Sequence, residues 1–197
     1  MEINDELIKS EIDEKISSLV KLTLESKHAE KTFIPGESTI PVTGKVFGEA
    51  ELTSVLNAGL DFWLTAGPYA EKFESEFAKK VGMRHSFMVN SGSSANLVAF
   101  YALTSPKLGD RAIKPGDEVI TVAAGFPTTI NPIIQFGAIP VFIDVDIVTH
   151  NVKADMIEKA VSPKTKAIMI AHSLGNPFDL DEVMRVAKKY NLWVVED

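Results

Sequence analysis

The amino-acid sequence predicts an α/β fold, with a mostly parallel sheet covered by helices and an N-terminal helical arm. From Ser86 onward short apolar runs alternate with helix-length segments such as Ala95 to Leu103, Asp155 to Val161 and Asp181 to Tyr190. The apolar runs are SFMVN, EVITV, IPVFID, AIMIA and LWVVE. Strands that alternate with helices form parallel βαβ units, and strands covered on both faces are apolar along their whole length.

The first residues form the predicted arm. Between Asn4 and His28, leucine, isoleucine and valine recur at helical spacing, which predicts one amphipathic helix. The segment KTFIPGESTIPVTGKVF contains two prolines and predicts an extended linker. A further helix is expected over Gly48 to Leu60. We therefore expect an arm and linker over residues 1–39, followed by the N-terminal part of a larger domain over residues 40–197.

Composition excludes several classes of function. The chain has 27 acidic and 20 basic residues, and this net charge of −7 argues against a nucleic acid or an anionic membrane as partner. No apolar run reaches the length of a membrane span, and the acidic N-terminus is unlike a signal peptide, so we expect a cytoplasmic protein. The chain has no cysteine, and its four histidines lack metal-ligand spacing, so we expect no metal site.

Polar segments follow the predicted strands and should meet at one place. NSGSS follows the first apolar run, AAGFPTT the second and HSLGNPFDLD the fourth, while Asp197 follows the last. In an open parallel sheet, ligands bind beyond the carboxyl ends of the strands. The sequence therefore predicts a ligand site built from these segments.

The residue types in these segments suit a flat ligand that carries a phosphate. Gly92 permits a tight turn, and Ser93 and Ser94 offer hydroxyl and backbone N–H donors at the positive end of a helix. Phe126 offers a ring face for stacking, and the Asp197 carboxylate can meet a cationic edge of the ligand.

Each of these features also has an ordinary structural explanation. Glycine and serine before a helix are common as N-caps, a phenylalanine commonly fills a core, and an aspartate commonly caps a turn. For His172, after the AIMIA run, we expect a hydrogen-bonded structural histidine rather than a proton carrier. Trp63 and Tyr69 could line a sugar site or fill the core, and the sequence leaves both alternatives open.

Several motifs together resemble a known family. The run IPVTGKVFGEAELTSVLNAGLDFWLTAGPYAEKFESEFAKKVGMRHSFMVNSGSSANL resembles the opening of the nucleotide-sugar aminotransferases, fold type I enzymes that use pyridoxal phosphate. GAIPVFIDVD, AHSLGNPFDLD and VVED follow in the family's order, so the resemblance extends from Ile40 to Asp197. The arm and the sequences GLDFWLTAGP, NSGSSANL and SLGNPFDLD are most similar to the CDP-4-keto-6-deoxyglucose-3-dehydrase branch, which serves 3,6-dideoxyhexose and O-antigen lipopolysaccharide synthesis.

The resemblance implies roles for individual residues around pyridoxal or pyridoxamine phosphate. A carboxylate beside the pyridine nitrogen raises the pKa of that nitrogen, so that the protonated ring accepts electrons from an adjacent carbanion. The implied cofactor residues are Gly92, Ser93 and Ser94 for the phosphate, Phe126 for ring stacking, Asp197 for the ring nitrogen and Asn176 for the ring hydroxyl or the substrate. Trp63 and Tyr69 are the implied substrate residues.

The catalytic residue that the resemblance implies does not lie in these residues. The family's Schiff-base lysine belongs beyond a later strand. The lysines weighed for this role lie in predicted helices or in turns that enter strands: Lys153, Lys159, Lys164, Lys166, Lys188 and Lys189. The chain also stops directly after an apolar strand. We therefore expect it to be the N-terminal part of a longer, incomplete large domain, inactive by itself.

The dehydrase branch implies a specific reaction. In this branch histidine replaces the downstream lysine, and pyridoxamine phosphate supports removal of the 3-hydroxyl from a nucleotide-linked keto sugar. Downstream cysteines hold an iron-sulfur cluster, a flavin or iron-sulfur reductase supplies electrons, and the enzyme is expected to be a homodimer. Two alternatives stay open: an ordinary pyridoxal-phosphate sugar aminotransferase, and a noncatalytic fragment with an aminotransferase-like fold.

Overall fold

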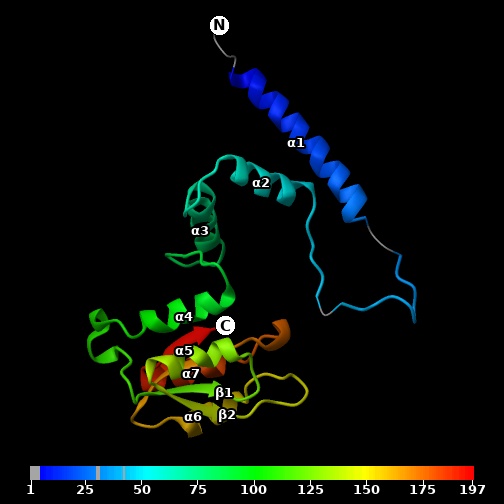
Figure 1. Cartoon of the computed structure of the whole chain (residues 1–197). Helices are drawn as coiled ribbons and strands as arrows, with labels where there is room; N and C mark the ends of the chain where they lie inside the picture. Colours follow the sequence, from blue (N-terminus) through cyan, green and yellow to red (C-terminus); the bar gives the residue numbers. More distant parts are fainter. Residues whose placement is uncertain (1–4, 30–31, 42) are drawn as a thin grey trace. The chain divides into compact units, whose positions relative to one another are not determined.

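A computed structural model of the chain describes residues 5–29, 32–41 and 43–197 (Figure 1). The chain forms two units, Met1–Ser86 and Phe87–Asp197. Helices α1 (Asp5–Lys27), α2 (Glu49–Leu60) and α3 (Pro68–Lys80) belong to the N-terminal unit. The strands and the remaining helices belong to the C-terminal unit. The predicted boundary between residues 39 and 40 stays a prediction.

The N-terminal unit consists of helices and connecting segments. Helix α1 confirms the helix that the spacing of leucine and isoleucine predicts. Helix α2 begins where the Gly48 N–H donates to the Glu51 carboxylate at 2.7 Å, and this bond lowers the pKa of Glu51. Helix α3 has Pro68 at its first position, where the missing N–H costs no helical hydrogen bond. None of the helices in the described residues is long and apolar enough to cross a membrane.

The C-terminal unit contains a parallel sheet of four strands in the order β2-β1-β3-β4 (Figure 1). The strands are β1 (Glu118–Val122), β2 (Ile139–Ile143), β3 (Thr165–Ile170) and β4 (Trp193–Glu196). The crossover helices are α5 (Pro127–Phe136), α6 (Ala154–Ala160) and α7 (Leu180–Tyr190). The sheet confirms the predicted α/β class and four of the predicted strands.

The first of the five predicted strands is wrong. The SFMVN segment, Ser86 to Asn90, does not form a strand in the structure. A strand exists only where a neighbouring strand pairs with it, and the edge strands β2 and β4 pair only with β1 and β3 among the described residues. An apolar run alone therefore does not make this segment a strand, and Phe87 in it is 75% exposed.

Alternate residues of each strand point to opposite faces of the sheet. Helices cover both faces, so each face contains its own buried cluster. The face toward α6 and α7 contains the buried residues Ile120, Ile157, Ile168, Val183 and Val186. The face toward α5 and toward α4 (Gly92–Ala102) contains Phe100, Ile113, Val119, Ile133, Ala167 and Met169. Trp193 and Val195 of β4 pack on this second cluster. By the same alternation, the side chain of Asp197 belongs to the face that α4 and α5 cover.

Candidate functional site

Asp197 extends the ladder between β3 and β4 by one step. Its N–H donates to the Ile170 carbonyl at 3.0 Å, and its carbonyl accepts from the His172 N–H at 3.1 Å. These bonds hold the Asp197 backbone at the carboxyl edge of the sheet, where the sequence predicts the ligand site. Its role in binding a ligand stays a prediction.

The Asp197 carboxylate joins α4 and α5. The Asn96 amide of α4 donates to Asp197 Oδ2 at 2.9 Å, and the Thr129 hydroxyl of α5 donates to the same oxygen. Asn96 is 5% exposed and Thr129 is 3% exposed, so both polar side chains are buried. One carboxylate oxygen at the end of β4 is therefore hydrogen-bonded to residues near the starts of two helices.

The N-terminus of α4 provides unpaired backbone donors. Ser91 is the N-cap, and its hydroxyl accepts the Ser94 N–H at 3.2 Å. Capping thus falls to Ser91, whereas the N–H groups of Gly92 and Ser93 lie in the first turn and have no intrahelical carbonyl to bind. Ser93 precedes Asn96 by three residues, so these donors lie about one helical turn, roughly 5 Å, from the residue that binds Asp197.

A small cavity lies beside these serines. Its volume is about 200 Å³, and α4 and α5 form its walls. The lining residues are Ser93, Ser94, Leu97, Thr128, Asn131, Pro132 and Gln135. Hydroxyl and amide groups from both helices therefore face the space next to the predicted phosphate position.

Phe126 is the N-cap residue of α5, three residues before Thr129. Its side chain is 70% exposed, so it does not fill the core of this unit. Pro127 at the first helical position sets the direction in which α5 begins. The structure thus leaves the Phe126 ring available for stacking within one turn of the residue that binds Asp197.

His172 follows β3 and has both ring nitrogens engaged. Nδ1 accepts the Phe178 N–H at 3.3 Å, so Nε2 carries the proton in the neutral ring and lies 3.1 Å from the Glu196 carboxylate. The ring also stacks on Phe178 at 4.0 Å between centroids. These contacts favour the predicted structural role of His172.

Asn176 belongs to the turn after β3, which is bonded to the loop after β2. Its amide donates to the Thr149 carbonyl at 3.3 Å, and the buried Asn151 amide donates to the Asn176 carbonyl at 2.9 Å. Asn176 Oδ1 can still accept a hydrogen bond. The contact of Asn176 with a ring hydroxyl or a substrate stays a prediction.

Trp63 and Tyr69 lie in the N-terminal unit. Trp63 is 63% exposed and Tyr69 is 49% exposed, so neither fills the core of that unit. The Trp63 indole N–H donates to the Ala66 carbonyl at 2.9 Å. A Cβ at Gly67 would lie 2.5 Å from the Trp63 ring, so a side chain there would force the ring to shift. The assignment of both aromatic residues to a substrate site stays a prediction.

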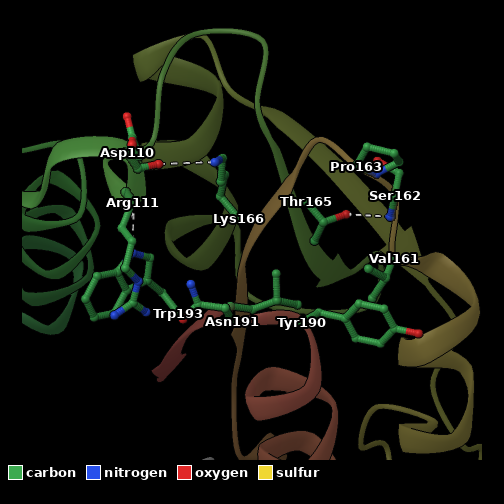
Figure 2. A pocket seen from close by; sticks show the side chains of 11 residues that line it. Asp110, Arg111, Val161, Ser162, Pro163, Thr165, Lys166, Tyr190, Asn191 and Trp193 are labelled. Atoms are coloured by element: carbon green, nitrogen blue, oxygen red, sulfur yellow. Dashed lines mark hydrogen bonds between the residues drawn. The ribbon is translucent and has the colours of Figure 1, made fainter.

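A larger pocket lies at the opposite edge of the sheet. Its volume is about 350 Å³, and its lining includes Thr165 and Trp193, the first residues of β3 and β4. Figure 2 shows these residues around the pocket. Arg111 lies 3.5 Å from the centre of the Trp193 ring, and Lys166 donates to the Asp110 carbonyl at 3.3 Å. Since Asp197 is four residues beyond Trp193, it lies about 13 Å further along β4. This pocket therefore contains none of the predicted site residues.

Sequence reasoning missed Asn96 and Thr129. Asn96 is an amide in the apolar stretch ANLVAF, and Thr129 follows Phe126 by one helical turn. Each is a polar side chain at a position that the helix buries, and buried polar groups require partners. That signal indicates a polar contact but does not name Asp197 as the acceptor.

The side chains around Asp197 fit a pyridoxal-type cofactor. The carboxylate has one oxygen, Oδ2, bound by two donors, which leaves Oδ1 to accept a proton-bearing ring nitrogen. The N-terminus of α4 offers N–H groups for a phosphate, and Phe126 offers an exposed ring face. Thus the structure provides the three kinds of contact that such a ligand requires.

Comparison with known proteins gives a consistent result. The model of the DegT/DnrJ/EryC1/StrS aminotransferase family matches residues 46–197. The lipopolysaccharide biosynthesis protein RfbH of Salmonella typhimurium strain LT2 is 57% identical over 184 residues, which are 93% of this chain and 42% of that protein. The dTDP-4-dehydro-2,6-dideoxy-D-glucose 3-dehydratase of Saccharopolyspora spinosa is 51% identical over 166 residues, which are 84% of this chain and 36% of that protein.

A solved structure supports the same relationship. Escherichia coli GDP-4-keto-6-deoxy-D-mannose-3-dehydratase with bound hydrated PLP is 33% identical and superimposes with a TM-score of 0.75. The match covers 81% of this chain and 40% of that protein. The chain therefore has the fold of the corresponding part of a fold type I enzyme and spans about two fifths of the proteins it resembles.

Proposed function

This chain belongs to the DegT/DnrJ/EryC1/StrS aminotransferase family, and from that membership we propose that its protein dehydrates a nucleotide-linked 4-keto-6-deoxy sugar at C3. The proposed substrate is CDP-4-keto-6-deoxyglucose, and pyridoxamine phosphate is the cofactor. The observation that carries the proposal is the Asp197 carboxylate, held between α4 and α5 with Oδ1 left to accept. Dehydration is favoured over transamination because two of the similar proteins are named 3-dehydratases.

The cofactor, when bound, supplies an amine for the sugar ketone and an aromatic ring that accepts electrons. Asp197 Oδ1 holds a proton on the ring nitrogen, because an adjacent anion favours the cationic ring. The N–H groups of Gly92 and Ser93 and the hydroxyls of Ser93 and Ser94 would hold the phosphate, and the Phe126 ring would offer a stacking face to the pyridine. Asn176 accepts from the ring hydroxyl or contacts the sugar.

The substrate and partner assignments follow from the same proposal. Trp63 and Tyr69 provide exposed aromatic surface for the nucleotide sugar. The enzyme is a cytoplasmic homodimer that receives electrons from a flavin or iron-sulfur reductase. Residues 1–197 contain no cysteine, so an iron-sulfur cluster would take its thiolate ligands from outside this stretch of sequence.

The test follows the C3 oxygen of the sugar. The full-length protein is incubated with pyridoxamine phosphate and CDP-4-keto-6-deoxyglucose in oxygen-18-labelled water. Reversible loss of the 3-hydroxyl introduces label at C3, which an NMR isotope shift separates from the C4 ketone, since a ketone exchanges its oxygen by hydration alone. We expect Asp197→Asn to slow this exchange by about a hundredfold or more. Asp181→Asn, in the first turn of α7, is the matched control and should keep the parent rate.

A parallel incubation, with pyridoxal phosphate and glutamate in place of pyridoxamine phosphate, separates the alternatives. Amino sugar formed with pyridoxal phosphate and glutamate, without label at C3, would identify an aminotransferase instead. If the protein causes no change in the cofactor's absorbance and no label enters C3, the noncatalytic alternative is correct.

A further inference from the structure

We infer that Asn96 and Thr129 are positioning residues for Asp197: together they hold its carboxylate through Oδ2 and direct Oδ1 to the cofactor's ring nitrogen. The inference rests on the proposed function, because it assumes a pyridine cofactor at Asp197. It adds two residues that would not themselves touch the cofactor.

The geometry of the two hydrogen bonds carries the inference. Asn96 and Thr129 come from different helices, and both donate to one oxygen of one carboxylate. A single donor would let the carboxylate turn about its hydrogen bond, whereas donors from two directions define the plane of the carboxylate. The backbone bonds of Asp197 to Ile170 and His172 fix its Cα as well. Oδ1 is the remaining strong acceptor on a side chain that is held at both ends.

Burial explains why this arrangement is specific. On the same helices, Phe100 and Ile133 are fully buried in the core, so an amide and a hydroxyl in this environment are costly unless they are bonded. The polar atoms of Asn96 and Thr129 find their partner in Asp197 Oδ2. The polar side chains therefore serve the Asp197 carboxylate rather than the packing of α4 and α5.

The chemistry of the donors also determines where a proton can lie. An amide N–H can only donate, so the Asn96 bond requires Oδ2 to stay an acceptor. A proton shared with the ring nitrogen is therefore confined to the Oδ1 side. If the donors are removed, the carboxylate rotates more freely, so Oδ1 is less often directed at the ring nitrogen. The ring nitrogen is then less protonated, because the anion that favours its charged form is less well placed.

The experiment observes the ring nitrogen directly. The full-length protein is loaded with nitrogen-15-labelled pyridoxamine phosphate, and the nitrogen chemical shift is followed from acid to alkaline pH. We expect Thr129→Val and Asn96→Ala each to lower the pH at which the nitrogen loses its proton by about one unit, on the scale of one buried hydrogen bond. Thr129→Ser keeps the hydroxyl and should keep the parent midpoint.

The variants also separate the positioning role of Asn96 and Thr129 from the proposed function. Urea unfolding of each cofactor-free variant checks its fold, and if either Thr129→Val or Asn96→Ala fails to fold, the other decides. Unchanged midpoints in the folded variants would overturn the inference while leaving the proposed function intact. If Asp197→Asn keeps the parent midpoint, or if the parent protein binds no pyridoxamine phosphate, the proposed function fails and the inference fails with it.

Discussion

The two units of this chain differ in how many apolar side chains they bury. In the C-terminal unit both faces of the sheet are covered, and residues such as Ile120 and Ile168 are fully inaccessible to solvent. In the described part of the N-terminal unit, the buried apolar residues are Ile16, Val20 and Ala78. Large apolar side chains in that unit, including Trp63, are exposed.

The difference shows where each unit obtains its stability. Burial of apolar surface is the main favourable term in folding, so the C-terminal unit is stabilised by its own core. The N-terminal helices bury little against one another, and segments with few buried contacts open at low free energy. Gly92, Phe126 and Asp197, which we propose to bind the cofactor, lie in the unit with the core. A rigid sheet holds them in place, as a binding site requires.

The largest change in stability is expected from a substitution in the inner strand β3. Ile168→Ala should lower the free energy of unfolding of the C-terminal unit by about 2–5 kcal/mol, because it leaves a cavity between β3 and α7. Urea unfolding is followed by Trp193 fluorescence in a Trp63→Phe background, which leaves the one tryptophan of the C-terminal unit. Leu22→Ala at an exposed position of α1 is the control, with an expected change below about 0.5 kcal/mol. If Leu22→Ala is as damaging as Ile168→Ala, the contrast between the two units is wrong.

An intermediate effect is expected at the start of α7. The Asp179 side chain accepts the Glu182 N–H at 3.0 Å and caps the helix. Asp179→Ala removes this acceptor and should cost about 1 kcal/mol of unfolding free energy. Asp179→Asn keeps an acceptor and should lie close to the parent. Equal losses in both variants would show that the charge of Asp179, rather than the cap, supports the helix.

The smallest effect is expected at the surface link between α6 and α7. Hydrogen bonds from Arg185, Lys189 and Tyr190 lower the pKa of Glu158 from 4.5 to about 2. The unfolded chain therefore binds a proton at Glu158 more readily between pH 4.5 and 2, so this contribution to stability is complete above pH 4.5 and is lost as the pH falls to 2.

Unfolding free energies of the C-terminal unit measured across that pH range test the link. Glu158→Gln should reduce the slope of stability against pH, and should change stability at neutral pH less than Asp179→Ala does. Glu71→Gln in α3 of the other unit is the control, and Trp193 fluorescence should report the parent slope. A parent slope in Glu158→Gln would show that the ion pairs with Arg185 and Lys189 do not persist in solution.

Part of the candidate site could be predicted because it depends on the order of residues along the chain. Asp197 directly follows an apolar strand, and in a parallel sheet that position is at the carboxyl edge. Gly92 and Ser93 begin a helix, and a helix start exposes N–H groups wherever the helix lies. Such features require only local pattern and the rule for parallel sheets.

Other parts of the site depend on which segments meet. Asn96 and Asp197 are 101 residues apart, and Thr129 and Asp197 are 68 apart. Their contact follows from how α4 and α5 pack on the sheet, and no local pattern contains that information. The strand predicted for Ser86 to Asn90 is wrong for the same reason. An apolar run favours a strand, but a strand also requires a neighbouring strand, and local pattern does not identify one.

Local sequence pattern was enough to predict four of the five apolar strands, the helices between them, their parallel order and the position of Asp197 at a strand end. These properties follow from periodicity and chain direction, which are local. Three features became visible in the folded chain alone: Oδ2 of Asp197 receives donors from two helices, Ser91 rather than Ser93 caps α4, and the Phe126 ring is exposed. The physical reason is that hydrogen bonds and burial between distant segments depend on how elements pack, and packing is a property of the folded chain as a whole.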